Sequence, residues 1–98
     1  MKIDAIVLRD KDNVATSLRD LESGEDALVG TLERTQRFPV RERIPYGHKF
    51  AVRDIPKGEE ILKYGEVMGR ATDDIPSGKH VHVHNVESLR GRGDLKKT

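Results

Sequence analysis

The sequence contains no cysteine, so disulfide bonds, thiolate metal sites and thiol nucleophiles are all excluded. Long apolar stretches are missing too: the longest covers residues 5–8, far below the ~18 residues of a membrane span. The N-terminus lacks the basic start, apolar stretch and small-residue cleavage site of a signal peptide. We therefore expect a soluble, cytoplasmic protein with no membrane partner.

A strong net charge is also lacking, because 18 Lys and Arg residues stand against 17 Asp and Glu residues, a net +1. Residues 89–98 alone carry +3, so residues 1–88 sum to −2. The basic residues thus gather in a terminal segment and not on a folded face, and we expect no nucleic-acid binding. A chain of 98 residues supports one small domain. We place it at residues 1–87, followed by a flexible basic tail at residues 88–98.

Short strands separated by turns make up most of the predicted secondary structure. We predict strands over residues 2–9, 27–32, 40–44, 49–52, 60–63, 66–71 and 80–86. Residues 13–21 are the exception, since apolar side chains recur there at helical spacing after the capping residues Asp10, Asp12 and Asn13. The predicted fold is therefore mainly β, with short bent strands and one short helix near the N-terminus.

The turns repeat one formula: aspartate, an aliphatic residue, two further residues and glycine. It occurs at residues 20–24, 54–58 and 74–78. Proline fixes φ in two of these turns, and the glycine accepts the positive φ that a tight turn requires. We expect the aliphatic residue to be buried beside each turn. The acidic doublets next to these turns are interpreted as solvated surface residues and not as catalytic pairs.

All four histidines lie in two places. His48 follows a turn at residues 44–47, and His80, His82 and His84 alternate with Val81 and Val83. In a strand the three imidazoles would share one face and the valines would be buried on the other. Neighbouring imidazoles would be roughly 6.6 Å apart, close enough to share an ion, whereas the outer pair would be roughly 13 Å apart. A straight strand therefore prevents His80 and His84 from binding the same metal.

This histidine face has two interpretations. A half-exposed strand needs only polar residues on its outer face, and histidine satisfies that requirement without any function. Histidine is, however, both a common metal ligand and the side chain best suited to move protons near neutral pH. We expect a functional site, with the structural interpretation as its alternative.

Several fragments in a fixed order resemble a known family: Gly47-His48-Lys49, Asp54-Ile55-Pro56-Lys57-Gly58, Lys63-Tyr64-Gly65, Met68-Gly69 and His80-Val81-His82-Val83-His84-Asn85. Residues 12–15, 18–21 and Gly24 also match the opening of that family. The chain resembles the small N-terminal SAF domain of altronate and galactarate dehydratases over roughly residues 3–95. The resemblance implies a SAF-type β-clip fold and a much larger catalytic region that completes the enzyme.

The resemblance further implies a small subunit of a sugar-acid hydro-lyase, foremost altronate dehydratase, which removes water from an aldonic or aldaric acid together with a large catalytic subunit. His48, His82 and His84 are the expected catalytic residues, and Lys49 and Asn85 are expected to bind substrate. A divalent metal, Fe²⁺ or Mn²⁺, would be held by His82 and His84 together with the partner chain. We expect it to bind this chain alone weakly or not at all.

Three alternatives stay open. The small chain of (2R)-sulfolactate sulfo-lyase resembles this one as well. SAF-like domains also serve as non-catalytic binding modules, although the histidine strand follows the dehydratase pattern. In a third interpretation the domain only drives oligomerisation, including homo-oligomers, and its histidines are incidental.

Overall fold

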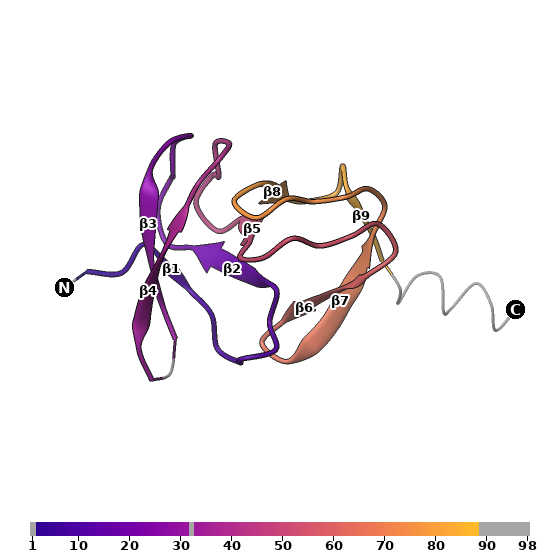
Figure 1. Cartoon of the computed structure of the whole chain (residues 1–98), viewed down its shortest axis with the longest axis horizontal. Coiled ribbons are helices and arrows are strands. Elements are labelled where there is room, and N and C mark those ends of the chain that lie inside the picture. Colours follow the sequence, from indigo (N-terminus) through magenta and orange to yellow (C-terminus); the bar gives the residue numbers. More distant parts are fainter. Residues whose placement is uncertain (1, 32, 89–98) are drawn as a thin grey trace, which may run out of the picture.

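The structure, a computed structural model, describes residues 2–31 and 33–88, and over these residues the chain forms nine strands and no helix (Figure 1). The strands are β1 (Ala5–Ile6), β2 (Val14–Ser17), β3 (Asp26–Gly30), β4 (Thr35–Pro39), β5 (Lys49–Ala51), β6 (Glu60–Lys63), β7 (Glu66–Ala71), β8 (His80–Val81) and β9 (Val86–Glu87). The mainly β fold is confirmed. The described residues include no helix long and apolar enough to cross a membrane. The predicted tail lies, apart from Ser88, outside the described residues.

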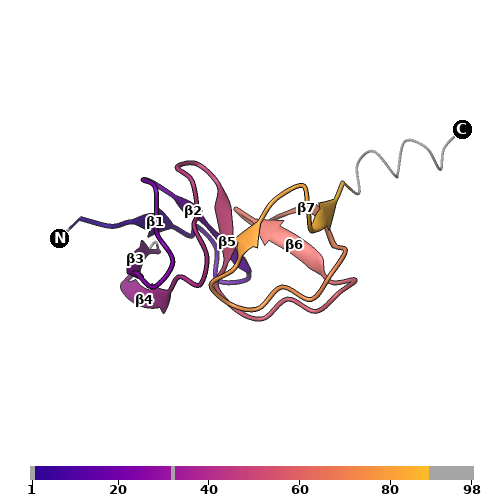
Figure 2. The same cartoon turned by 90° about the horizontal axis from the view of Figure 1, so that it is seen from above.

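Two sheets form the molecule. Six strands make a mixed sheet in the order β4-β3-β1-β2-β5-β8, and three make an antiparallel sheet in the order β6-β7-β9. Within the first sheet β1 and β3 are parallel and the other neighbours antiparallel. Figures 1 and 2 show β3 and β4 toward the N-terminal end, β6 and β7 toward the other, and β5 between them.

The central strands β2 and β5 serve two hydrophobic cores at once. Ala15 and Phe50 belong to one cluster, whereas their neighbours Val14 and Ala51 belong to the other. All four side chains are 2% exposed or less. Successive side chains of a strand point to opposite faces, so one ribbon with both faces apolar connects the two ends of the domain.

The helix predicted over residues 13–21 is wrong, because residues 14–17 form β2, which pairs antiparallel with β1 and β5. Leu18, which the helical pattern places on the buried face, is 44% exposed. β2 gains its strand partners β1 and β5, and the core contacts of Val14 and Ala15, from other segments of the chain. Tertiary pairing thus overrides a weak helical spacing.

The capping residues of that predicted helix stabilise a hairpin instead. The buried Asp12 carboxylate accepts hydrogen bonds from the backbone N–H groups of Arg9, Tyr64 and Gly65, at 3.2, 2.8 and 2.7 Å. Tyr64 and Gly65 form the β6–β7 turn with positive φ angles of 56° and 80°. Asn13 donates to the backbone oxygen of Glu60 and accepts from the N–H of Leu62.

The repeated turns are confirmed in their buried residues and extend to a fourth member. Leu21, Ile55 and Ile75 are at most 2% exposed. Residues 43–47 adopt the same arrangement with arginine in place of aspartate, and Ile44 is fully buried. The turns associate in pairs, since Leu21 bridges Ile44 and Ile55 bridges Ile75, each through two backbone hydrogen bonds of 2.8 Å.

Other strand predictions differ mainly in their ends. β5, β6 and β7 agree closely with the predicted ranges. The strand predicted over residues 40–44 is wrong, because the extended segment is β4, at residues 35–39, where it pairs with β3. Residues 43–47 belong to the fourth turn, whose apolar residue had suggested a strand.

Candidate functional site

The histidine segment bends where a continuous strand was expected. β8 ends at Val81, residues 82–85 form a turn, and β9 begins at Val86. Val81 is fully buried as predicted, but Val83 is 82% exposed, so the expected alternation stops after one valine. The bend brings the ring centroids of His80 and His84 to 5.3 Å, and the separation of roughly 13 Å expected for a straight strand is wrong.

Asn85 closes this turn from the inside. Its side-chain oxygen accepts the N–H of His82 at 3.0 Å, and its side-chain nitrogen donates to the backbone oxygen of His80 at 2.9 Å. The backbone N–H of Asn85 donates to the oxygen of His82 at 3.1 Å. The side chain expected to bind substrate is therefore engaged with the backbone that carries the histidines.

His48 reaches the same place from a different part of the chain. The turn at residues 43–47 leads into β5, which pairs antiparallel with β8, and Phe50 lies opposite His80 in that ladder. His48 also ties its backbone to the preceding turn, because its N–H donates to the oxygen of Pro45. Sheet pairing thus makes neighbours of residues 32 positions apart.

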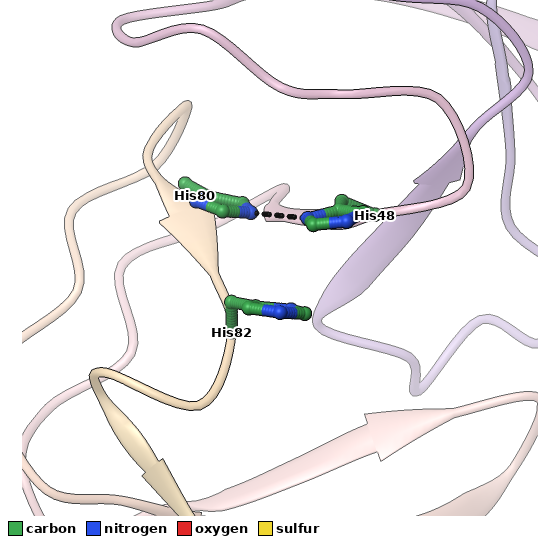
Figure 3. Close-up of side chains that lie close together, drawn as sticks. All are labelled: His48, His80 and His82. Carbon is green, nitrogen blue, oxygen red and sulfur yellow. Dashed lines mark hydrogen bonds between the residues drawn. The ribbon is translucent and has the colours of Figure 1, made fainter.

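Three imidazoles converge as a result; we call His48, His80 and His82 the histidine cluster (Figure 3). Nδ1 of His48 and Nε2 of His80 are 2.9 Å apart, a hydrogen bond in which one nitrogen must carry the proton. The rings of His48 and His82 stack with centroids 4.2 Å apart and planes inclined by 16°. His84 lies at the edge of the cluster, exposed, with its ring tilted by 40° against that of His80.

The cluster fits a divalent transition metal. One ring nitrogen from each of the three residues lies within 4.8 Å of the others. Imidazole nitrogens bind such ions at about 2.0–2.1 Å, so two ligands of one ion lie at most about 4.2 Å apart, and a small movement of the rings would bring all three nitrogens to one ion. Three protein ligands also leave coordination positions for substrate or for a partner's side chain. The sequence pattern had placed His82 in this role but paired it with His84 rather than with His80.

The environment favours uncharged imidazoles. Burial, followed by the neighbouring His48, His82 and His84, lowers the pKa of His80 to about 4, and Glu42 opposes this shift only in part. Burial and then His48, Lys49 and His84 also lower the pKa of His82. Neutral imidazoles at neutral pH can accept a proton or bind a metal, which a charged imidazolium cannot do.

Lys49 stands beside the cluster at an open cavity of about 240 Å³. The lining also includes His82 and the apolar side chains of Ile61, Met68, Val83 and Val86. Burial and then the nearby Lys63 lower the pKa of Lys49. Within the described part of the chain no carboxylate forms an ion pair with Lys49. A lysine that has no carboxylate partner among the described residues, at a cavity whose described lining includes no acidic side chain, is suited to an anionic ligand.

Glu42 is a residue of this site that the sequence pattern does not indicate. Its carboxylate accepts the backbone N–H of His80 at 2.9 Å and so fixes the start of β8. Glu42 lies between two arginines in a charged segment, 38 positions before His80. The backbone N–H of Arg41 donates to the oxygen of Gly78 at 2.9 Å and holds these two distant segments together, so no local pattern identifies Glu42.

Comparison with known proteins identifies relatives of the whole domain. The family model of the altronate/galactarate dehydratase SAF domain matches residues 3–89. The (2R)-sulfolactate sulfo-lyase subunit alpha of Chromohalobacter salexigens is 38% identical over 93 residues, which are 92% of this chain and 99% of that subunit. Altronate dehydratase of Escherichia coli is 43% identical over 77 residues, 79% of this chain but 15% of that enzyme. Galactarate dehydratase (L-threo-forming) of the same organism is 40% identical over 80 residues, 14% of its length.

Proposed function

Since the chain belongs to the altronate/galactarate dehydratase SAF-domain family, we propose that it is the small component of an altronate dehydratase. In this role it works with a large catalytic region to remove water from an aldonic or aldaric acid. The small share of the E. coli dehydratases that it matches supports a partner of much greater length. The open cavity beside Lys49 supports the same view, because a substrate site shielded from water needs further walls.

A second candidate is the small subunit of a (2R)-sulfolactate sulfo-lyase. Its support is the match along 99% of the alpha subunit from Chromohalobacter salexigens. Both candidates share an acidic substrate and a lyase reaction, and they differ in the group that leaves. The cavity beside Lys49 suits either acid group, so activity with the two substrates must decide between them.

The observation that carries the proposal is the convergence of the histidine cluster, in which the pKa values of His80 and His82 are lowered. A neutral imidazole can take the proton next to the substrate carboxylate and return it to the leaving hydroxide. We assign this proton transfer to His48 and His82, with His84 exposed toward the partner. Lys49 would hold the acid group of the substrate in the adjacent cavity.

Alternatively, the cluster would hold the divalent metal, Fe²⁺ or Mn²⁺, expected for the complete enzyme. In that case His48 and His82 are ligands and do not carry the proton, because a nitrogen lone pair that binds an ion cannot also accept a proton. His48, His80 and His82 supply three nitrogen ligands, and carboxylates of the partner would complete the shell. Such an ion supplies electrostatic stabilisation of the negative charge that develops on substrate oxygens. The protein's part is to keep the three imidazoles converged and the pKa values of His80 and His82 low.

The test is reconstitution with the large dehydratase chain from the same source. The double variant His48→Gln with His82→Gln should fold normally and lower turnover about a hundredfold or more, the usual loss when proton transfer is removed. Lys57→Gln, an exposed change in a turn, is the matched control and should keep wild-type turnover. Altronate, galactarate and sulfolactate are assayed in parallel. Wild-type turnover in the folded double variant would refute a catalytic role for the cluster.

A further inference from the structure

We propose that Asn85 is a positioning residue, which holds the histidine cluster in its converged geometry by closing the turn at residues 82–85. The inference deepens the proposed function, on which its importance rests, but it concerns contacts within this chain. It can therefore be tested without the partner and without substrate.

The side-chain contacts of Asn85 lead to the backbone of the cluster. One side-chain amide bonds both to the N–H of His82 and to the oxygen of His80, residues on either side of Val81. These two bonds fix the direction in which both imidazoles leave the chain. The backbone oxygen of Asn85 accepts the N–H of Thr72 at 2.9 Å, which anchors the turn next to the end of β7.

The burial of Asn85 favours a positioning role for this residue over substrate binding. Asn85 is 8% exposed, although the adjacent Val83 and His84 are exposed. A buried amide with both its oxygen and its nitrogen bonded to the backbone has little surface left for a ligand. The arrangement needs an acceptor and a donor on one short side chain. Aspartate can only accept at neutral pH, and alanine can do neither.

The bend brings His82 to the two imidazoles that the pairing of β5 with β8 makes neighbours. An extended chain through residue 84 would separate successive imidazoles by roughly 6.6 Å, whereas the rings of His80 and His82 stack at 5.2 Å. The same bend lets the His82 ring reach His48 at 4.2 Å. Loss of the Asn85 amide removes both side-chain bonds of the turn, leaves only the backbone bond from Asn85 to His82, and should release His82 from His48.

Asn13 provides a matched control. It is also buried, at 1% exposure, and its amide likewise bonds one backbone oxygen, of Glu60, and one backbone N–H, of Leu62. These contacts lie in β6 and not in the histidine turn. Asn13→Ala therefore removes an equivalent pair of side-chain hydrogen bonds to the backbone, while the contacts of the histidine cluster stay in place.

The experiment compares wild type, Asn85→Ala and Asn13→Ala as purified chains. Nuclear Overhauser contacts between the ring protons of His48 and His82 report the stacking, and calorimetric titration with Ni²⁺ reports the convergence of ring nitrogens. Both variants should melt at lower temperature than wild type. Only Asn85→Ala should lose the ring contacts, and its Ni²⁺ affinity should fall about 10–100-fold, as when a residue that orients metal ligands is removed.

The other possible results of this comparison also decide the role of Asn85. Retained ring contacts and wild-type Ni²⁺ affinity in Asn85→Ala would overturn the proposal, as would equal losses in Asn13→Ala, since the effect would then be general destabilisation. If Asn85→Ala does not fold, Asn85→Asp replaces it, because only the donor toward His80 is lost and the same ring contacts should weaken. If wild type binds no Ni²⁺, the metal role in the proposed function fails, and the ring contacts alone decide the role of Asn85.

Discussion

Protonation of His80 should destabilise the fold. The folded chain lowers the pKa of this imidazole from 6.5 to about 4, first through burial and then through His48, His82 and His84. As the pH falls below 6.5, the unfolded chain takes up the proton and the folded chain does not. Stability is therefore full above pH 6.5 and declines as the pH falls toward 4.

The structure sets the size of this effect. If the whole difference in the pKa of His80, from 6.5 to about 4, acted on stability, the free energy of unfolding would fall by at most about 2 kcal/mol between pH 7.5 and pH 5. His80 is only partly buried, and solvent screening reduces the expected loss to about 1 kcal/mol. His82, whose pKa is also lowered, acts in the same direction. The carboxylates of Asp4 and Glu25, whose pKa values are lowered, contribute mainly below pH 5.

Urea unfolding at pH 7.5, 6.5, 5.8 and 5 measures this loss, with a chelator present because a bound metal would compete with the proton. His80→Gln should flatten the dependence on pH, whatever it does to stability at pH 7.5. His84→Gln is the control, since it removes an exposed imidazole and keeps His80 in place. The reasoning fails if His80→Gln and wild type lose the same free energy between pH 7.5 and pH 5.

Three further predictions concern the scaffold and the isolated chain. Asp12→Ala should lower the free energy of unfolding by about 3 kcal/mol or more, measured in urea, because three backbone N–H groups lose their acceptor. Gly58→Ala should lower the free energy of unfolding by only about 1–2 kcal/mol, because the glycine has a φ of +91° but a Cβ would meet open space. Gly78→Ala should lower it clearly more, because at a similar φ of +90° its Cβ would meet the backbone oxygen of Pro39. Equal losses for the two glycines would contradict this packing. The purified chain alone should not turn over altronate, galactarate or sulfolactate with Fe²⁺ or Mn²⁺, and full turnover would refute the need for a partner.

The sequence predicts well those strands whose ends are determined by residues next to them in the chain. β6 and β7 agree with the predicted ranges because Tyr64 and Gly65 mark the turn between them. The failed helix had the opposite cause. Asp12 and Asn13 have the chemistry of helix caps, but the backbone groups that they bind lie about 50 positions later in the sequence. No local pattern distinguishes the two uses.

The histidine segment shows the same limit within the site. The alternation of histidine and valine predicts the burial of Val81, which lies in the ladder with β5. The alternation does not predict the bend, because the bend depends on Asn85, a side chain for which the family resemblance implies substrate binding. The straight-strand geometry therefore excluded His80 from the pair that the sequence favoured, although His80 hydrogen-bonds His48.

The repeated turn explains how the two halves of the site meet. Each turn ends in a glycine that starts a short segment leading into a strand: β3, β5, β6 or β8. Behind Gly24 and Gly58 these segments begin with acidic residues, whereas behind Gly47 and Gly78 they carry His48 and His80. The two histidine-bearing units are the two whose strands pair, as β5 with β8, so their imidazoles face one another across that ladder. If the repeated turn served only the fold, the two units whose strands β5 and β8 pair would not both need a histidine. The placement of a second imidazole within hydrogen-bonding distance of the first therefore favours a functional site over an incidental polar face.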